Sequence, residues 1–441
     1  MRLDEKRCRG CVNCTKRCPT EAIRVHNGKA QIIESRCIDC GECIRHCLHR
    51  AKAAHTDDLE ILDAYKYTIA LPAPAMYAQF NPDVCNEKIN AAIRGIGFNE
   101  VYEVAKAAEI VTVAIREYMQ KASIPLPVIS SACPVVVRLI QVRFPELQEY
   151  LLPFDAPIEV AATIAREEAV RTTGLASEDI GIFFITPCPA KMTAIKQPSA
   201  NRTSNIDGAI ALNKIYFSVL KNLVKVTEPV EDGPSDIGVG WALSGGETVG
   251  IPPERCLVVS EIQNVIQVFE AMCLGKLRNI DYVECLSCGG GCIGGPLTVE
   301  NRFTAELNMK KRLKKLKKCS TSSLIRAEKM YAQGVVRKLD IRVAKAGSPL
   351  QLDEDVERAL VKVELLEKTL DSLPGFDCGS CGSPNCKSLA EDIVRGNAVP
   401  TDCIFKLREK VQNLAEEIVD LANKLPPVMS RDHFEDEGEE K

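Results

Sequence analysis

Short apolar runs alternate with amphipathic stretches through the middle of the chain, from about Tyr65 to Arg342. Short apolar runs between turn residues are typical of buried strands, and apolar residues recurring every three or four positions are typical of helices. The alternation therefore predicts a layered α/β body. The predicted strands are Tyr67–Leu71, Val128–Ser130, Ile180–Ile185, Ile237–Val239 and Cys256–Val259. Two of the predicted helices are Asn86–Arg94 and Val160–Glu168.

Two stretches near the C-terminus have a more regular apolar spacing of alternating three and four residues. This spacing is that of a coiled-coil seam, and it also suits two helices that pack on each other as a hairpin. The pattern leaves both arrangements open. The first stretch has Val356, Leu360, Val363, Leu366, Leu370 and Leu373. The second has Ile404, Leu407, Val411, Leu414, Ile418, Leu421 and Leu425.

Composition adds one unusual feature, which is the presence of 21 cysteines in 441 residues. The 56 basic and 60 acidic side chains nearly balance, so charge gives no argument for a nucleic-acid or membrane partner. The N-terminus has no apolar signal core, and the longest apolar candidate, around Ile124–Val137, is too short to span a membrane. We therefore expect a cytoplasmic protein whose cysteines are reduced and bind metal.

These patterns predict a multidomain α/β chain. Residues 1–56 are cysteine-dense and form the first expected domain, and residues 57–345 form the α/β body. A weak linker, Ala346–Pro349, precedes a small α-helical module at residues 350–425. Residues 426–441 are an acidic tail that we expect to be disordered.

The first domain carries two similar cysteine runs. Each run offers three closely spaced thiolates and a fourth one four residues later, and in two-cluster ferredoxins that fourth thiolate ligates the other cluster. We assign the first cubane to Cys8, Cys11, Cys14 and Cys47, and the second to Cys37, Cys40, Cys43 and Cys18. A pair of zinc sites is the alternative. The segment resembles bacterial ferredoxins, including Pro19–Ile23, and this resemblance implies that it carries electrons.

The C-terminal module has a further set of four cysteines. Three of them lie in a loop rich in glycine, and the fourth follows a predicted helix, Lys387–Arg395. The set resembles the small four-iron four-sulfur domain appended to corrinoid and sensory redox proteins, and zinc is again the alternative. Its members are Cys378, Cys381, Cys386 and Cys403.

Four cysteines of the central body follow strand-like runs and lie in three loops rich in glycine or proline. Each alone is compatible with a buried small apolar residue. Together they predict a metal centre assembled from distant parts of the sequence, and glycines would let the backbone approach a bulky group. The four are Cys133, Cys188, Cys288 and Cys292.

These loops resemble the three signature segments of the di-iron (FeFe) hydrogenases, and further similarity lies at Ala73–Ala75, Gly97–Val104 and Phe144–Leu147. The resemblance implies an H-cluster, in which the four central cysteines hold a cubane and Cys292 bridges it to a di-iron unit with CO and CN ligands. It also implies that Lys191 binds one cyanide. The backbone of Pro74 and Ala75 would contact the other cyanide.

The departures from this family concern proton transfer. The family's proton-donating cysteine before the first cluster cysteine is Ala132 here, and an alanine cannot exchange a proton. Other expected relay groups are replaced by Ala194, Ala114, Ile115 and the Leu151–Pro153 segment. The third signature ends in Gly294–Thr298, a variant that resembles the sensory branch of the family.

The sequence thus predicts a slow, sensory, FeFe-hydrogenase-like oxidoreductase with four 4Fe–4S clusters and, after maturation, a di-iron unit. Its expected partners are hydrogen and protons, maturation proteins, a redox or signalling protein, and a second copy of the chain. The alternative is a related electron-transfer or assembly protein without the di-iron unit. A run of basic residues at Met309–Lys318 suits either a solvated helix face or a docking surface for an acidic redox partner. The cysteines left without a role are Cys85, Cys256, Cys273, Cys285 and Cys319.

Overall fold

The structure is a computed structural model that describes residues 1–121, 123–198, 203–226, 233–251, 255–316, 321–338 and 350–424. It divides into two compact units. The first contains residues 1–8, 17–22 and 34–350, and the second contains residues 9–16, 23–33 and 351–441. The cysteine-dense segment 1–56, predicted from the sequence as one domain, is shared between the two. The linker 346–349 and the tail 426–441 lie outside the described residues.

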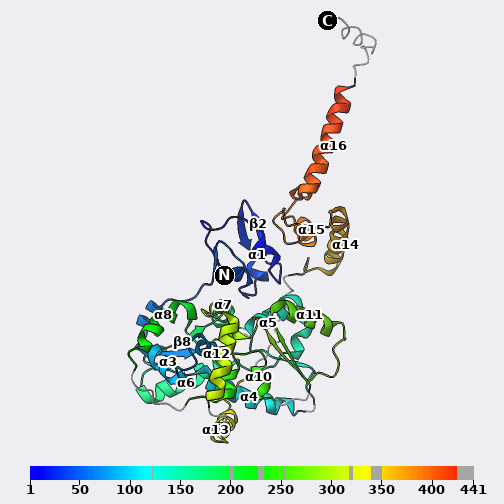
Figure 1. Cartoon of the computed structure of the whole chain (residues 1–441). Coiled ribbons are helices and arrows are strands. Elements are labelled where there is room, and N and C mark those ends of the chain that lie inside the picture. The colour runs from blue at the N-terminus through cyan, green and yellow to red at the C-terminus, as the bar shows by residue number, and fades with distance from the viewer. Residues whose placement is uncertain are drawn as a thin grey trace. The chain divides into compact units, whose positions relative to one another are not determined.

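The larger sheet of the first unit has four parallel strands in the order β6-β5-β8-β9. Parallel sheets need cover on both faces, and helices including α3, α6 and α8 lie around this sheet (Figure 1). The strand β8 is accordingly buried along its whole length. The strands are β5 (Tyr67–Pro72), β6 (Glu100–Val101), β8 (Ile180–Thr186) and β9 (Gly208–Ala211).

A smaller parallel sheet has the order β10-β11-β7. Its central strand, β11, is buried at every residue, and the core beside the sheet includes Val136 and Phe269. Its outer strand β10 is less covered, because the side chain of Val258 is 41% exposed. The strands are β7 (Val128–Ile129), β10 (Cys256–Ser260) and β11 (Tyr282–Leu286).

The first unit contains these helices in chain order: α2 (Glu42–Arg45), α3 (Asn86–Arg94), α4 (Val104–Met119), α5 (Pro134–Arg143), α6 (Pro157–Thr173), α7 (Pro189–Lys196), α8 (Leu212–Leu223), α9 (Asp236–Gly240), α10 (Gly246–Val249), α11 (Ile262–Cys273), α12 (Arg302–Lys315) and α13 (Thr321–Ala332). Short antiparallel strands β1 (Arg2–Leu3) and β4 (Lys52–Ala53) pair near the N-terminus. The 3-10 helices of this unit are η1 (Glu34–Arg36), η2 (Leu59–Ala64), η3 (Pro74–Gln79), η4 (Pro145–Tyr150), η5 (Ser177–Asp179) and η6 (Cys292–Gly294). Among the described residues, no helix combines the length and the apolar character needed to cross a membrane.

One predicted strand was wrong, because Ile237–Val239 lies in helix α9. This helix packs on α4 so tightly that a Cβ at Gly238 would lie 2.2 Å from the carbonyl oxygen of Ala105. A run of three apolar residues cannot distinguish a strand from a buried helix turn, and here tertiary contact decided. The strands β5, β7, β8 and β10 confirm the other predicted strands, and α3 and α6 confirm the two predicted helices.

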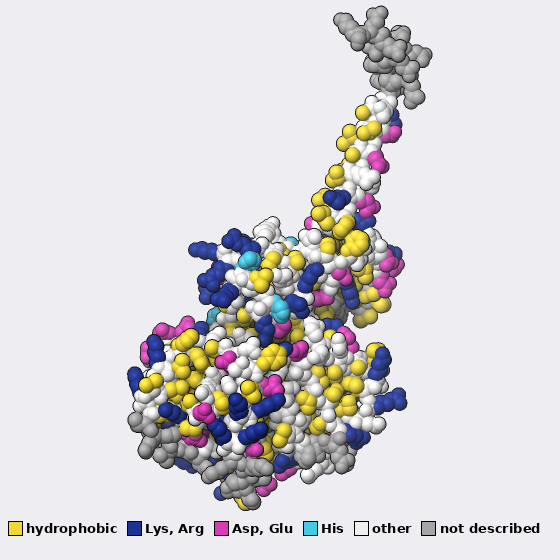
Figure 2. Space-filling view, viewed as in Figure 1, with side chains coloured by type: hydrophobic (Ala, Val, Ile, Leu, Met, Phe, Trp, Pro, Cys, Tyr) yellow, Lys and Arg dark blue, Asp and Glu magenta, His cyan; other side chains and the backbone are white. Residues whose placement is uncertain are grey.

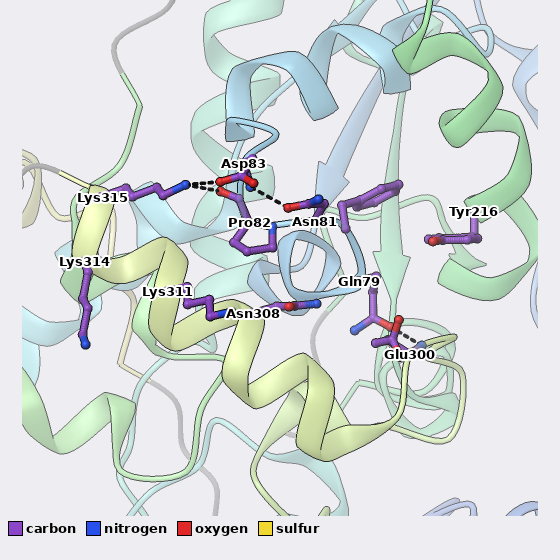
Figure 3. Close-up of a pocket in the computed structure, with 11 residues that line it drawn as sticks. Gln79, Asn81, Pro82, Asp83, Tyr216, Glu300, Asn308, Lys311, Lys314 and Lys315 are labelled. Atoms are coloured by element: carbon purple, nitrogen blue, oxygen red, sulfur yellow. Dashed lines mark hydrogen bonds and ion pairs between the residues drawn. The ribbon is translucent and has the colours of Figure 1, made fainter.

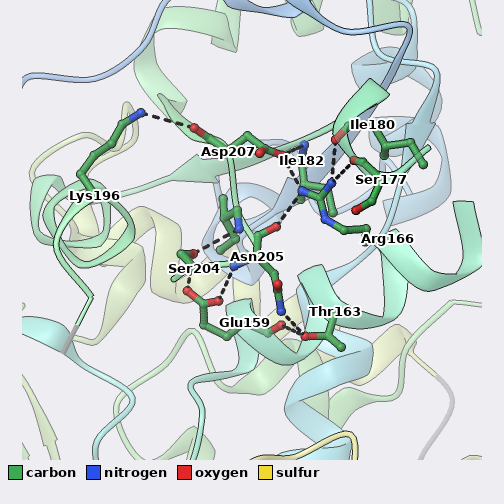
Figure 4. Close-up of polar contacts among 11 residues, drawn as sticks. Glu159, Thr163, Arg166, Ser177, Ile180, Ile182, Lys196, Ser204, Asn205 and Asp207 are labelled. Carbon is green, nitrogen blue, oxygen red and sulfur yellow. Dashed lines mark hydrogen bonds and ion pairs between the residues drawn. The ribbon is translucent and has the colours of Figure 1, made fainter. Parts of the chain in front are cut away.

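An arginine fixes helix α6 to the loops around β8 and β9 (Figure 4). Arg166 pairs with Asp207 at 2.6 Å and donates to the carbonyl oxygens of Ser177, Ile180 and Asn205. On the same helix, the Glu159 carboxylate accepts hydrogen bonds from Ser204 and Asn205. These bonds hold the segment that enters β9 against the helix that covers β8.

The second unit joins a short N-terminal part of the chain to the C-terminal helices. An antiparallel hairpin, β2 (Ile23–His26) and β3 (Lys29–Ile32), lies with the short helix α1 (Asn13–Lys16). The C-terminal helices are α14 (Val356–Ser372), α15 (Cys386–Val394) and α16 (Ile404–Ala422), with the 3-10 helix η7 (Pro400–Asp402) before α16.

The helix α16 does not form a hairpin with α14. The helix α14 packs against α15, and α16 runs away from both (Figure 1). Apart from Lys406, every residue of α16 is exposed, and its apolar side chains form a visible stripe (Figure 2). Of the two arrangements left open by the sequence, the hairpin is therefore wrong. Leu425, the last seam position, lies outside the described residues.

Candidate cluster site

The four central cysteines follow the carboxyl ends of parallel strands. Cys133 follows β7 and caps the N-terminus of α5, and Cys188 follows β8 and caps the N-terminus of α7. Each cap is followed by proline at the first helical position, where the missing N–H costs nothing. Cys288 follows β11, and Cys292 begins η6. The strand order thus directs loops from both sheets of the first unit toward one site.

The structure brings these four sulfurs within electrostatic reach of one another. Cys288 interacts with Cys133, Cys188 and Cys292, and Cys292 also interacts with Cys133 and Cys188. Burial, reinforced by Cys133, raises the pKa of Cys188 to about 11 and that of Cys292 to about 12. Burial also raises the pKa of Cys288. Thiols of this kind become thiolates when a metal displaces their protons, so the donor set fits a cluster.

Close backbone approaches pack the third loop tightly against its neighbours. A Cβ at Gly291, where φ is +98°, would lie 2.5 Å from the carbonyl oxygen of Ala242. A Cβ at Gly295 would lie 2.3 Å from the carbonyl oxygen of Pro187, the residue before Cys188. Glycines therefore let the third loop lie directly on the second. Among the described residues, no three His, Cys, Asp or Glu side chains are grouped so as to hold a single metal ion.

The three further residues implied by the resemblance are held in defined positions. The Nζ atom of Lys191 donates to the carbonyl oxygen of Ala132 at 2.8 Å. Pro74 and Ala75 begin η3, and the side-chain amide of Gln79 donates to the carbonyl oxygen of Ala75 at 3.1 Å. The Oε1 atom of Gln79 accepts from the backbone of Val299, just beyond the third loop. The amide thus ties the two segments together.

The second ferredoxin-type set also comes together in the first unit. Cys37 and Cys40 both interact electrostatically with Cys18, and Cys40 interacts with Cys43. Burial, reinforced by Asp39, raises the pKa of Cys37 to about 11. Burial also raises the pKa of Cys40. This is the grouping expected when the fourth thiolate comes from the other run.

The loop of this second set lies against the central site. A Cβ at Gly41 would lie 2.5 Å from the Cγ of Pro296. Thr193, on α7, donates to Asp39 at 2.8 Å, and Arg45 donates to the sulfur of Cys288 at 3.3 Å. Two cysteine sites of the first unit are therefore neighbours.

The first ferredoxin-type set is divided between the units. Cys8 and Cys47 belong to the first unit, and Cys11 and Cys14 belong to the second. In the first unit, the backbone N–H of Ala51 donates to the sulfur of Cys47 at 3.2 Å. The grouping of these four residues stays a prediction from their spacing.

Three of the four C-terminal cysteines belong to or contact a small apolar core. Cys403 is buried with Leu389, and Cys381 and Cys386 pack against the same cluster. Hydrogen bonds from Ser380 lower the pKa of the exposed Cys378. Such bonds favour the thiolate, which is the form that binds metal.

A buried acidic network beside the first loop was not expected from the sequence. Ser130 donates to the Oε2 atom of Glu247 at 2.8 Å, and Tyr282 donates to its Oε1 atom at 2.5 Å. Burial, reinforced by Glu284, raises the pKa of Glu247 to about 8, and burial also raises the pKa of Glu284. The N–H of Ala132 donates to the hydroxyl of Ser130 at 3.3 Å. The one available signal was a glutamate inside the apolar strand β11, because unpaired carboxylates are rarely buried.

Apolar packing occupies several positions where proton-relay groups are expected. Ala114 and Ile115 are completely buried, and Leu151 and Leu152 are nearly so. All four belong to the hydrophobic clusters of the first unit. Ala194 lies half-buried on α7.

The cationic run lies on α12 and mixes structural with exposed side chains. Arg312 is 2% exposed and donates to the carbonyl oxygens of Asn81 and Val84, so this cation holds the fold together. Lys311, Lys314 and Lys315 line a surface cavity of about 810 Å³ (Figure 3). In that cavity Lys315 pairs with Asp83 at 2.5 Å.

The remaining cysteines have ordinary surroundings. Cys285 is fully buried in β11, and Cys256 is half-buried in β10. Cys85 is exposed, and the exposed Cys273 donates to Glu146 at 3.0 Å. Cys319 lies outside the described residues.

Three segments match known protein families. Residues 66–250 match the family described as the iron only hydrogenase large subunit, C-terminal domain. Residues 1–48 match the 4Fe-4S dicluster domain, and residues 373–405 match a family described as an Fe-S cluster.

Two curated relatives are hydrogenase subunits. The NADP-reducing hydrogenase subunit HndD of Solidesulfovibrio fructosivorans is 22% identical over 354 residues, which cover 67% of this chain and 56% of that protein. The periplasmic Fe hydrogenase large subunit of Nitratidesulfovibrio vulgaris is 27% identical over 272 residues, which cover 57% of this chain and 64% of that protein. The chain thus spans less than two thirds of each relative. A variant of an FeFe-hydrogenase from Chlamydomonas reinhardtii aligns with a TM-score of 0.48 at 15% identity, over 60% of this chain and 89% of that one.

Proposed function

This chain is an FeFe-hydrogenase-like iron–sulfur protein with a 4Fe–4S ferredoxin-type domain at its N-terminus, and from that premise we propose that it is a slow, hydrogen-responsive sensor. It interconverts hydrogen with protons and electrons and passes its redox state to a partner. The observation that carries the proposal is the set of four interacting, half-buried cysteines beside Ala132. The chain keeps the cluster ligands and lacks the family's nearest proton donor.

The proposed active centre uses residues of all three loops. Cys133, Cys188, Cys288 and Cys292 would hold a cubane, and Cys292 would bridge it to a di-iron unit. When bound, that unit would supply the cleavage or formation of hydrogen, with two protons and two electrons per molecule. Lys191 would bind one cyanide, with Pro74 and Ala75 in contact with the other.

A substitute proton route supports slow turnover. The hydroxyl of Ser130 lies two residues from Ala132 and donates to Glu247 at 2.8 Å. Because burial raises the pKa of Glu247 to about 8, its carboxyl holds a proton near neutral pH. Only the ionised form of Glu247, which is the minor form near neutral pH, can take a proton from the site: the Ser130 hydroxyl passes its proton to the carboxylate and is reprotonated from the site, while Tyr282 orients the carboxylate. The methyl group of Ala132 leaves a gap at the start of this route, so proton transfer limits the rate.

Electrons leave by the loop of the second ferredoxin-type set. That loop contacts the central site through Thr193 and Asp39 and through Arg45 and Cys288. A 4Fe–4S cluster held by Cys37 and its partners would accept them one at a time.

The apolar seam of α16 is the proposed protein contact. Its a positions hold β-branched Ile404, Val411 and Ile418, and its d positions hold leucines. This combination favours a parallel pair of helices, so the occupant we propose is a second copy of the chain. Maturation proteins would install the di-iron unit, and a chain with 21 cysteines, sixteen of them proposed cluster ligands, suits the reducing cytoplasm.

Infrared spectroscopy of anaerobically maturated protein tests the proposal. Carbonyl and cyanide bands, together with hydrogen turnover far below that of fast hydrogenases, are the expected result. Four intact iron–sulfur clusters without those bands would instead favour an electron-transfer or assembly protein. Turnover equal to that of fast enzymes would contradict the sensory role.

A further inference from the structure

In the second unit, the loop of the C-terminal cysteines lies directly on the ferredoxin-type hairpin. Gly382 has φ +87°, and a Cβ there would lie 2.0 Å from the carbonyl oxygen of Val25. The N–H of Val25 donates to the carbonyl oxygen of Gly382 at 2.9 Å. Since the two backbones are in contact, only glycine fits at position 382.

A buried ion pair fixes the same contact. Arg24 on β2 bonds both carboxylate oxygens of Asp392 on α15, through Nε at 2.5 Å and Nη2 at 3.2 Å. The two side chains are 4% and 10% exposed, and Ser383 also donates to Asp392 at 3.2 Å. A two-point arginine–carboxylate pair sets orientation as well as distance. Breaking one partner of a buried pair is strongly destabilising.

A second contact joins the two cysteine loops themselves. A Cβ at Gly379 would lie 3.2 Å from the Cε of Lys16 and 3.6 Å from the Cβ of Val12. Val12 adjoins Cys11, and Lys16 ends the helix that carries Cys14. Gly379 itself lies between Cys378 and Cys381. Ligands predicted for two different clusters are therefore separated by a single layer of contacts.

We propose that this contact is a one-electron bridge between the C-terminal cluster and the ferredoxin-type cluster that Cys11 and Cys14 help to hold. When the C-terminal cluster donates the electron, it is oxidised by one electron and the ferredoxin-type cluster is reduced by one electron. No proton moves. An external one-electron redox protein supplies or removes the electron at the C-terminal module. The proposal rests on both sites holding 4Fe–4S clusters, as the proposed function requires.

Electron paramagnetic resonance of the reduced full-length protein tests the bridge, with iron measured in the same samples. The test variant is Gly382→Ala, which forces the two backbones apart. Its matched control is Gly396→Ala, because Gly396 has a similar φ of +77° and nothing within 4 Å of a Cβ. Both substitutions impose the same backbone strain, and only the first disturbs the contact.

In the wild type and in Gly396→Ala we expect magnetic coupling between the reduced C-terminal cluster and its neighbour. In Gly382→Ala we expect that coupling to be lost and the iron content to be unchanged. Coupling that persists in Gly382→Ala at full iron content, or that is absent from fully loaded wild type, would overturn the bridge.

If Gly382→Ala also loses iron, the variant Arg24→Gln provides the decisive measurement of coupling, because Arg24 lies outside the C-terminal module. Loss of coupling at full iron content supports the bridge, and retained coupling overturns it. Wild-type protein that lacks iron at these sites would overturn the cluster assignment itself, which is a separate failure.

Discussion

At the residue scale, Glu247 is a buried carboxyl whose pKa is raised far above its ordinary value. It is buried, it accepts from Ser130 and Tyr282, and the neighbouring Glu284 disfavours a second negative charge. Its pKa of about 8 compares with an ordinary value of 4.5. Between these values the folded protein keeps a proton that the unfolded chain has lost. Folding stability from this group is therefore full below pH 4.5 and falls as the pH rises toward 8.

The substitution Glu247→Gln should flatten this pH dependence, since glutamine resembles the protonated acid and does not titrate. We expect the loss of unfolding free energy from pH 5 to pH 8 to shrink, by up to about 1.4 kcal/mol per pH unit. Thermal unfolding at several pH values measures it, with the exposed Glu178→Gln as the control. An unchanged slope would mean that Glu247 is ionised in the folded protein at pH 5.

The substitution Ala132→Cys should restore one proton-transfer group beside the proposed di-iron unit. General acid–base groups typically contribute about 10²–10⁴-fold. We expect a smaller rise in hydrogen turnover and an altered pH profile, because Ala114, Ile115 and Ala194 still interrupt the family's route. Hydrogen evolution by matched, fully maturated proteins checks this. A rise to the rate of fast hydrogenases would show that the missing cysteine alone accounts for the slow turnover.

At the element scale, α16 is a long helix whose apolar seam is left uncovered within the second unit. Leu414 is 47% exposed and Ile418 is 65% exposed, although both occupy seam positions. In proteins most of the stability of a helix comes from packing of its apolar face, and the apolar face of the 19-residue α16 is exposed. A partner helix would bury the seam and stabilise α16.

Replacing Leu414 and Ile418 by glutamate should abolish self-association while leaving the iron content unchanged. Buried carboxylates facing each other across a seam are strongly unfavourable. Sedimentation at several protein concentrations measures the assembly. The control is Val419→Glu, because Val419 is 59% exposed beside the seam and outside it. A double variant with the wild-type mass in solution would show that the seam does not hold two copies together.

At the scale of the whole molecule, sixteen cysteines are assigned to four clusters. With four irons to a cubane, we expect about sixteen irons per chain before maturation and about eighteen after it. Anaerobic metal analysis checks the count. A count of eight irons or fewer, with zinc in the remaining sites, would mean that two of the four assigned sites hold zinc instead of a 4Fe–4S cluster.

The sequence by itself predicted the grouping of the cysteines and determined much of the secondary structure, because both depend on local signals. Thiolate spacing is set by the geometry of one loop, and this predicted Cys18 with Cys37, Cys40 and Cys43, which the structure brings together in the first unit. Apolar periodicity likewise located β5, β8 and α3.

Only the tertiary structure decided what depends on residues distant in the sequence. The helical state of Ile237–Val239 follows from contact with α4, and the pairing of Glu247 with Ser130 and Tyr282 requires three separate segments to meet. The uncovered seam of α16 and the buried Arg24–Asp392 pair have the same origin, since a repeat or a lone charge does not specify its partner. The local spacing of residues determines which cysteines can act together as metal donors and which segments form helices or strands. The burial and the pKa of a side chain depend instead on the residues that the fold packs around it.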